Sequence, residues 1–197
     1  MYRFIETIRI ENGNAQRLSF HQKRMDETCS HFNLEKTRIC ISNLIKNCPA
    51  KGTYKFRMVY GQDGVEDISC QKYTMKKIES LKIVDGGDID YSYKYEDRSR
   101  LDLLTGMKAD CDNIIISKNG LLTDTSYTNL ALFDGVKWIT PRNPLLNGTM
   151  RRFLLQDEKI TEDDIKITDL AKFKQIALFN SMIDFGKIVL NMDAVRI

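Results

Sequence analysis

Large apolar residues recur at every second position in one segment of the first half of the chain. Tyr54, Phe56, Met58 and Tyr60 occupy every second position, which is the period of a half-buried β-strand. Other stretches of this half carry apolar residues at helical spacing or end at Gly, Asn or Pro. The pattern predicts a strand at residues 2–11, helices at about 18–32 and 36–47, and strands at 54–60 and 68–73.

Short strands dominate the pattern of the second half. Two dipeptides, Asn119-Gly120 and Asp134-Gly135, separate apolar runs and are typical of tight hairpin turns. The predicted elements are strands at 81–84, 113–117, 121–124, 128–133, 137–139 and 176–179, an extended stretch at 91–95, and helices at 98–108, 148–155 and 168–173. Gly86-Gly87 interrupts the pattern, so we expect an α+β chain with a small lobe at residues 1–86 and a larger lobe at 87–197.

The composition narrows the class of protein. The chain has 197 residues, of which 42% are hydrophobic and 29% charged, as is typical of a globular protein with a real core. Its net charge of +3 comes from scattered charges without a basic run, so nucleic-acid binding is not supported. No apolar run approaches the roughly 20 residues of a membrane-spanning helix, and nothing near Met1 resembles a signal peptide. We expect a cytoplasmic protein that binds neither nucleic acid nor membrane.

The cysteines form no recognisable metal or redox motif. There are five, an odd number, and none is spaced as Cys-x-x-Cys or as a Cys/His ligand set. We therefore expect free, buried thiols in a reducing compartment, and no metal site. The cysteines are Cys29, Cys40, Cys48, Cys70 and Cys111.

The strongest chemical signal lies between residues 124 and 151. Asp124 stands on a predicted strand, Asn129 follows it, and Gly148 begins a predicted helix whose first residues are Thr149 and Met150. A carboxylate can face a ring nitrogen, and the unpaired N–H groups of a helix start can receive a phosphate. Together they could hold a phosphorylated aromatic cofactor at both ends. Taken alone, Asn-Gly before a helix is more often only a turn and a cap.

Two basic side chains are candidates for the rest of such a site. Lys94 lies between Tyr93 and Tyr95, whose rings could wall its amine from water, as a nucleophilic lysine requires. His21 and Arg24 share one face of a predicted helix, where the arginine fork could bind a phosphate. Spacing alone leaves alternatives open: Lys94 could be a strand-edge lysine, and the helical pair a solvated basic face.

In their order and spacing, these elements resemble the class IV aminotransferase family, the fold-type IV enzymes of pyridoxal 5′-phosphate. Phe4-Ile5-Glu6-Thr7-Ile8-Arg9 is similar to the first retained strand of the family, and His21-Gln22-Lys23-Arg24-Met25 to its His-x-x-Arg-Leu element. Leu146-Asn147-Gly148-Thr149-Met150-Arg151 resembles its Leu-x-Gly-x-x-Arg turn. Phe179-Asn180-Ser181-Met182-Ile183 resembles the Asn-Ala-Leu-Met stretch beside the substrate in aminodeoxychorismate lyases.

The resemblance implies a two-lobed α+β fold with a barrel-like larger lobe, a homodimer, and pyridoxal 5′-phosphate as cofactor. It implies that Lys94 is the catalytic, Schiff-base lysine and that Asp124 pairs with the pyridinium nitrogen. It also implies that Arg24 and the backbone N–H groups of the Gly148 turn bind the phosphate. The cofactor-binding residues implied in this way are Arg24, Lys94, Asp124, Asn129, Gly148, Thr149, Met150, Asn180 and Ser181.

Two features depart from the family pattern. The family usually has glutamate where this chain has Asp124, so the side chain is one methylene shorter. The chain also begins close to its Phe-x-Glu-Thr strand, without the family segment that usually precedes it. We expect the substrate contacts of that segment to be missing or to be supplied by a partner subunit.

Lyases and aminotransferases of this family share all of these parts. The segment from Asn180 to Ile183 resembles the lyases more than the Gly-Thr-Ala segment of branched-chain aminotransferases. We therefore expect an aminodeoxychorismate lyase-like enzyme of folate biosynthesis, which releases 4-aminobenzoate and pyruvate from a small-molecule amino substrate. An aminotransferase for branched-chain or D-amino acids is the alternative, and a cofactor-binding protein without turnover is the second alternative.

Overall fold

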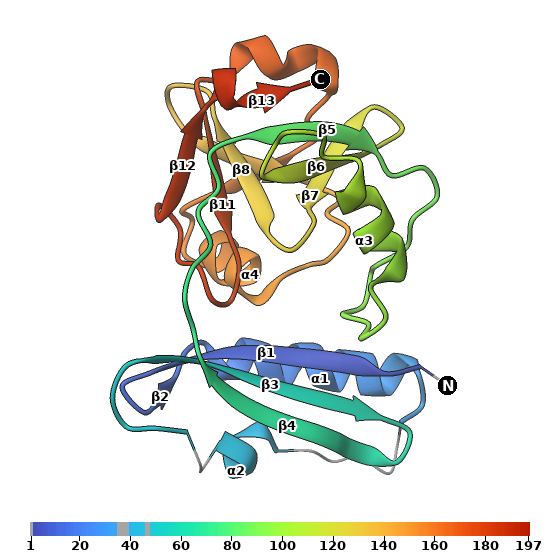
Figure 1. The fold of residues 1–197 in the computed structure, drawn as a ribbon, viewed down its shortest axis with the longest axis vertical. Coiled ribbons are helices and arrows are strands. Elements are labelled where there is room, and N and C mark those ends of the chain that lie inside the picture. The colour runs from blue at the N-terminus through green and yellow to red at the C-terminus, as the bar shows by residue number, and fades with distance from the viewer. Residues whose placement is uncertain (1, 35–39, 46–47) are drawn as a thin grey trace. The chain divides into compact units, whose positions relative to one another are not determined.

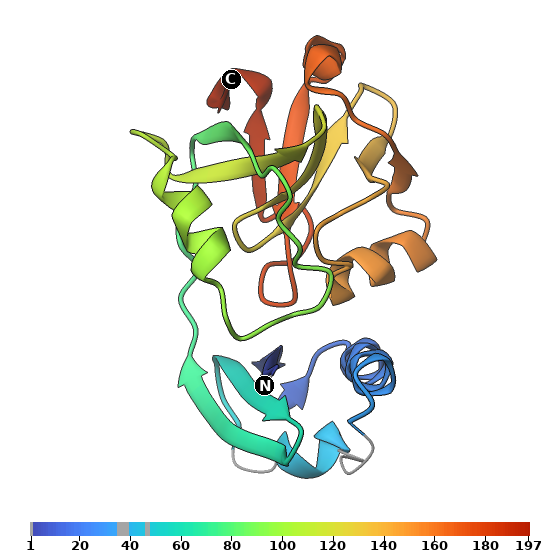
Figure 2. The same ribbon diagram turned by 90° about the vertical axis from the view of Figure 1, so that its right-hand side faces the viewer.

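The structure is a computed structural model that describes residues 2–34, 40–45 and 48–197 (Figures 1 and 2). These residues form two compact units with a mixed α+β fold. The first unit comprises Met1–Met75 and Tyr93–Asp97, and the second comprises Lys76–Ser92 and Arg98–Ile197. The short segment Tyr93–Asp97 thus returns to the first unit after the chain has already entered the second.

The first unit is an antiparallel sheet with one long helix against it (Figure 1). Its strands lie in the order β2-β1-β3-β4, and β1 pairs with β3 from Phe4 opposite Tyr60 to Glu11 opposite Thr53. The elements are β1 (Phe4–Glu11), β2 (Asn14–Ala15), α1 (Leu18–His31), α2 (Ile41–Leu44), β3 (Thr53–Gly61) and β4 (Gly64–Lys72).

Alternation along β1 sets the core of the first unit. Phe4, Ile8 and Ile10 stand at even positions and pack with Met25 of α1 in one buried cluster. Glu6 occupies an even position of the same strand and is also 0% exposed. The period of the strand therefore carries one carboxylate to the buried face, where it needs partners.

The second unit contains two sheets. One has the strand order β10-β9-β8-β11-β12, and the other β13-β5-β6-β7. Its strands are β5 (Leu81–Asp85), β6 (Asn113–Lys118), β7 (Leu121–Thr125), β8 (Asn129–Phe133), β9 (Trp138–Pro141), β10 (Thr161–Asp163), β11 (Gln175–Phe179), β12 (Ile188–Asn191) and β13 (Val195–Arg196). Its helices are α3 (Ser99–Gly106), α4 (Thr149–Gln156) and the short 3-10 helices Ile167–Lys172 and Met192–Ala194.

The chain crosses from one sheet of the second unit to the other between β7 and β8. Two buried residues, Ser126 and Thr128, make this crossing together with Tyr127, which is exposed between them. The backbone N–H of Thr125 donates to the carbonyl of Thr128 at 2.9 Å, and their hydroxyls lie 2.7 Å apart. The tight turn brings the end of β7 and the start of β8 side by side, and both carry predicted site residues.

The α+β class and most of the predicted elements agree with the structure. The stretch 91–95 differs, because it forms only an isolated bridge between Tyr95 and Phe4 and no strand. The helix expected at 168–173 is a 3-10 helix at Ile167–Lys172. The helix expected at 36–47 falls partly outside the described residues, and within them Ile41–Leu44 is α-helical.

The division between the units differs from the boundary expected after residue 86. Strand β5 pairs in parallel with β6, from Leu81 opposite Asn113 to Asp85 opposite Ser117, so it belongs to the sheet of the second unit. The segment Tyr93–Asp97 belongs to the first unit because it hydrogen-bonds to β1. Gly86-Gly87 therefore marks a turn inside the second unit and not the change of unit.

The expectation of five free, buried thiols is wrong. Cys48 and Cys70 form a disulfide between the segment after α2 and strand β4. Of the remaining cysteines, Cys111 is buried, whereas Cys29 is half-buried and Cys40 is exposed. Sequence spacing could not reveal the pair, because the fold brings the two residues together across 22 positions.

Two general features concern membranes and metals. Within residues 2–34, 40–45 and 48–197, no helix is both long enough and apolar enough to cross a membrane. The same residues contain no group of three or more His, Cys, Asp or Glu side chains arranged to hold a metal ion.

Candidate functional site

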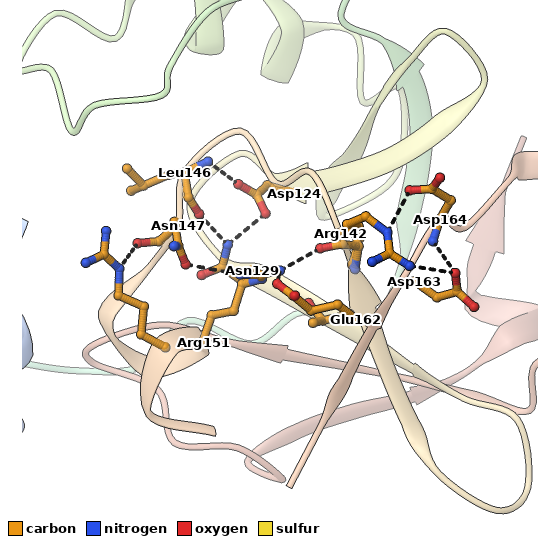
Figure 3. A network of polar contacts seen from close by, with 12 residues as sticks. Asp124, Asn129, Arg142, Leu146, Asn147, Arg151, Glu162, Asp163 and Asp164 are labelled. Atoms are coloured by element: carbon orange, nitrogen blue, oxygen red, sulfur yellow. Dashed lines mark hydrogen bonds and ion pairs between the residues drawn. The ribbon is translucent and has the colours of Figure 1, made fainter. Parts of the chain in front are cut away.

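A buried carboxylate near the end of β7 forms the centre of the candidate site (Figure 3). Asp124 is 5% exposed, and both of its oxygens accept hydrogen bonds. Oδ1 accepts from Nδ2 of Asn129 at 2.8 Å, and Oδ2 accepts from the backbone N–H of Leu146 at 2.8 Å. Asp124 thus joins β7 to the start of β8 and to the loop before α4.

Asn129 begins β8 and connects the acid to the same loop. Its Nδ2 donates to Oδ1 of Asp124 and also to the backbone carbonyl of Leu146 at 2.8 Å. Both amide hydrogens are then in use, which fixes the side-chain orientation and turns Oδ1 of Asn129 toward Gly148. Asn129 therefore positions the acid and the loop relative to each other.

Gly148 lies in close approach to Asn129. A Cβ atom at residue 148 would be 2.1 Å from Oδ1 of Asn129. The φ angle of Gly148 is −66°, which any residue can adopt, so the need for glycine is steric. The close approach fixes the entry of the chain into α4.

The start of α4 has the properties of an anion site. Gly148 is its N-cap residue and makes no side-chain cap hydrogen bond. The first helical residues, Thr149 and Met150, are 1% and 2% exposed. The first turn of a helix has backbone N–H donors without intrahelical partners and the positive end of the helix dipole. A phosphate is a suitable ligand for such a helix start.

Arg151 contacts the same loop (Figure 3). It is 2% exposed, and its Nη1 donates to Oδ1 of Asn147 at 3.1 Å. Its Nη2 donates to the carbonyl of Pro141 at 2.9 Å and forms an ion pair with Glu162 of β10. These contacts tie the first turn of α4 to β9 and β10 and place a buried positive charge beside that turn.

Burial makes the Asp124 carboxyl difficult to ionise. Desolvation raises its pKa from the ordinary 3.8 to about 7, although the hydrogen bonds from Leu146 and Asn129 and the charge of Arg151 favour the ionised form. A cation facing the carboxylate would repay the desolvation. The site is therefore suited to a positively charged group at Asp124.

Asn180 uses its side chain to hold a turn after β11. Its Oδ1 accepts hydrogen bonds from the backbone N–H groups of Met182 at 2.8 Å and Ile183 at 3.0 Å. Its Nδ2 donates to the carbonyl of Tyr127 at 3.0 Å, in the crossing between β7 and β8. Asn180 thus fixes the turn that contains half-buried Ser181 beside that crossing.

The first unit contains Arg24, the predicted phosphate ligand. It lies on α1, is 6% exposed, and pairs with Glu6 of β1. Its Nε donates to Oε1 of Glu6 at 2.8 Å and its Nη2 to Oε2 at 2.6 Å. Nδ1 of His21 lies 2.6 Å from the same Oε2. The alternative of a solvated basic face is therefore wrong for His21 and Arg24, because both are buried.

Lys94 lies in the segment that returns to the first unit. Its backbone carbonyl accepts a hydrogen bond from the N–H of Ile5 at 2.9 Å. The rings of Tyr93 and Tyr95 pack against the core of that unit, so they anchor the segment on both sides of Lys94. The lysine itself is half-buried. Consecutive residues of β1, Ile5 and Glu6, thus support the Lys94 backbone and the Arg24 side chain.

The predicted site residues form two groups, one in each unit. The first unit holds Arg24 and Lys94, and the second holds the other seven, among which contacts join Asp124, Asn129 and the Gly148 loop. Three contributors carried no predicted role: Glu6, Glu162 and the backbone of Leu146. Only Glu6 had a visible signal, since a glutamate at an apolar position of a strand needs a buried partner.

Comparisons with known proteins identify the family of the chain. Residues 103–189 match the family model of amino-transferase class IV. An uncharacterized protein of Haemophilus influenzae is 36% identical over 187 residues, which are 92% of this chain and 98% of that protein.

Two solved structures share the fold. The putative 4-amino-4-deoxychorismate lyase of Haemophilus somnus is 34% identical, with a TM-score of 0.82 and coverage of 93% of this chain and 98% of its own. A hypothetical aminotransferase of Mycobacterium tuberculosis in its PLP-bound form is 13% identical and shares the fold alone, with a TM-score of 0.74 and coverage of 93% and 79%. The chain belongs to the class IV aminotransferase family.

Proposed function

We propose that this protein is a pyridoxal 5′-phosphate-dependent enzyme that acts on an amino-acid-like substrate through Lys94. The observation that carries the proposal is the network of Asp124, Asn129 and Gly148. It connects an acid suited to a cation with a helix start suited to a phosphate. Pyridoxal 5′-phosphate has a ring nitrogen that becomes a cation when protonated, and a phosphate on the same ring system.

Asp124 fits the ring nitrogen. Its carboxyl is buried, and its pKa of about 7 means that ionisation without a facing cation is costly. A protonated ring nitrogen would supply the missing positive charge, and Asp124 would in turn keep the proton on that nitrogen. The hydrogen bonds from Asn129 and Leu146 hold the carboxyl in place for this pairing. The shorter aspartate is thus supported from two sides.

The start of α4 fits the phosphate, and the resemblance to the family implies Arg24 as a further phosphate ligand. The backbone N–H groups of Thr149 and Met150 belong to the first turn of α4, and Gly148 lets the chain enter that turn close to Asn129. Arg24 offers a planar guanidinium that recognises phosphate oxygens with two parallel hydrogen bonds. These residues would bind and orient the cofactor.

Lys94 would perform the chemistry on the proton next to the substrate amine. When bound, pyridoxal 5′-phosphate withdraws electrons from the carbon that bears this amine. The Lys94 amine would hold the cofactor covalently before the substrate arrives, and would then accept and return the proton of that carbon as general base and acid. The backbone of Ile5 and the packed rings of Tyr93 and Tyr95 hold the lysine segment in place.

The reaction that we propose is that of an aminodeoxychorismate lyase, which forms 4-aminobenzoate and pyruvate. The support is the resemblance of Asn180-Ser181-Met182-Ile183 to the lyase segment, together with the similarity over nearly the whole chain to the Haemophilus somnus protein. Asn180 fixes this segment at Tyr127, which gives it a defined shape for a substrate. An enzyme with this activity would serve folate biosynthesis. We also propose that it acts as a homodimer.

One assay separates the lyase from its alternatives. Purified protein is incubated with pyridoxal 5′-phosphate and aminodeoxychorismate, with Lys94→Ala as the matched control. We expect 4-aminobenzoate and pyruvate in equal amounts without any added 2-oxo acid, and none with the control. Amino transfer that requires an added 2-oxo acid would identify an aminotransferase. If the protein neither releases 4-aminobenzoate nor transfers the amino group to a 2-oxo acid, it is a cofactor-binding protein without turnover. That result would contradict the proposal.

A further inference from the structure

We propose that Glu6 is a positioning residue that orients the Arg24 guanidinium for the phosphate of the cofactor. The inference rests on the proposed function, because it assumes that Arg24 binds this phosphate. Glu6 would not touch the cofactor itself. Its effect would pass through Arg24, and His21 would hold Glu6 in the required orientation.

Glu6 lies where an unpaired carboxylate would be very costly. It is 0% exposed on β1, at the same face as Phe4 and Ile8. A charge in such surroundings persists only when other groups pair with it and donate hydrogen bonds. Here burial alone would raise the pKa of Glu6, but the charge of Arg24 and the bond from His21 bring it down to about 2. Glu6 is therefore an anion at every physiological pH.

The contact between Glu6 and Arg24 fixes the plane of the guanidinium. Nε and Nη2 donate to the two different oxygens of Glu6, at 2.8 and 2.6 Å, so the pair is side-on and bidentate. A guanidinium has five N–H donors in one plane, of which Glu6 takes two. The Nη1 side of the group must then point away from Glu6 in one fixed direction. A fork that is oriented in advance loses less entropy when it binds a phosphate.

His21 completes the support of Glu6. Because Glu6 is ionised, it can only accept, so Nδ1 of His21 carries the proton and donates to Oε2 at 2.6 Å. Burial lowers the pKa of His21, which favours the neutral imidazole. His21 and Arg24 lie three residues apart on α1 and reach the same carboxylate. One buried acid on β1 thereby orients the functional arginine on α1.

Two other roles for Glu6 lead to different results. If Glu6 only stabilised the packing of α1 on β1, its loss would lower the affinity for every ligand of the site and the stability of the fold. If Glu6 mainly neutralised Arg24, its loss would strengthen the attraction for a phosphate. A positioning role predicts a weaker affinity that is confined to ligands with a phosphate.

The test compares pyridoxal 5′-phosphate with pyridoxal, which lacks the phosphate. Dissociation constants for both are measured by absorbance titration of the apoprotein for the wild type and Glu6→Gln. The matched control is Glu11→Gln, on the same strand, whose carboxylate pairs with Arg9 and is 41% exposed. We expect Glu6→Gln to raise the dissociation constant of pyridoxal 5′-phosphate by about tenfold or more, and that of pyridoxal by less than about twofold. Glu11→Gln should change neither.

A double-mutant cycle keeps the test decisive if Glu6→Gln is unstable. In the Arg24→Gln background, adding Glu6→Gln should leave the affinity ratio of the two ligands unchanged, because the residue through which Glu6 acts is gone. An equal loss for both ligands, tighter phosphate binding, or an undiminished effect in the Arg24→Gln background would overturn the inference. Failure of the wild type to bind pyridoxal 5′-phosphate would instead contradict the proposed function.

Discussion

Oδ1 of Asn129 occupies the space that a side chain on Gly148 would need, since a Cβ atom there would lie 2.1 Å away. The amide of Asn129 cannot turn aside without breaking its bonds to Asp124 and to Leu146. A shift of Gly148 at the start of α4 would therefore also displace Asn129 and its partner Asp124. A cofactor bound at both places would have its ring nitrogen and its phosphate held by one connected structure.

The first prediction concerns this close approach. Gly148→Ala should displace Asn129 or the first turn of α4, and weaken pyridoxal 5′-phosphate binding by about tenfold or more. The measurement is an absorbance titration of the apoprotein. Gly106→Ala is the matched control, because nothing lies within 4 Å of a Cβ at the end of α3. Equal affinities of the two variants would show that the approach of Asn129 is not needed for binding.

The second prediction uses the pH dependence of stability. The pKa of Asp124 is raised in the folded apoprotein, from 3.8 to about 7, so its contribution to stability is fully present below pH 3.8 and is lost as the pH rises through 7. The loss amounts to about 4 kcal/mol over this range. The amide of Asp124→Asn cannot ionise, so this variant should not lose stability in this way.

Urea unfolding of both apoproteins between pH 4 and pH 8 measures the effect. The stability of the wild type relative to Asp124→Asn should fall steadily over this range, whatever constant cost the amide introduces. Saturating pyridoxal 5′-phosphate should reduce this loss of stability, because a protonated ring nitrogen stabilises the ionised form of Asp124. Parallel stability curves for the two apoproteins would mean that Asp124 is already ionised at low pH.

The third prediction concerns Glu6 at acidic pH. Its pKa is lowered in the folded state from 4.5 to about 2, so its contribution to stability is present above pH 4.5 and is lost as the pH falls toward 2. The contribution is on the order of 3 kcal/mol. Stability measured from pH 6 down to pH 2 should decline more in the wild type than in Glu6→Gln. A steeper decline in the variant would contradict the assignment.

The fourth prediction concerns the support behind α4. Arg151→Lys keeps the charge but cannot serve Asn147, Pro141 and Glu162 together, so it should lower the free energy of unfolding by about 2 kcal/mol. Arg100→Lys is the control, because that arginine is 57% exposed in its pair with Asp88 and should cost less than about 0.5 kcal/mol. Similar losses in the two variants would show that the Arg151 contacts contribute little.

Local patterns predicted the parts of the fold that depend on local chemistry. Strand β3 follows from the alternation of Tyr54, Phe56, Met58 and Tyr60, and the predicted strands 121–124 and 128–133 correspond to β7 and β8. Strands such as β10 and β13 are two or three residues long and exist only because a neighbouring strand pairs with them. No local pattern could mark such strands.

Other features of the fold depend on contacts between segments that are distant in the sequence, and the sequence did not indicate them. The place of β5 depends on its partner β6, and the segment around Lys94 depends on β1. The resemblance predicts Arg24 as a phosphate ligand, but its pairing with Glu6 requires that a helix and a strand meet. The candidate site is thus visible in sequence as separate motifs, while the contacts that position them come from the fold.

The most direct measurement of the central claim locates the covalent attachment of the cofactor. The protein is saturated with pyridoxal 5′-phosphate, reduced with borohydride, digested and mapped by mass spectrometry, with Lys94→Ala as the control. We predict that the pyridoxyl group is found on Lys94 in the wild type and that the control binds the cofactor only reversibly. Labelling of Lys108 or Lys118 in place of Lys94, or equal labelling of the control, would contradict the account.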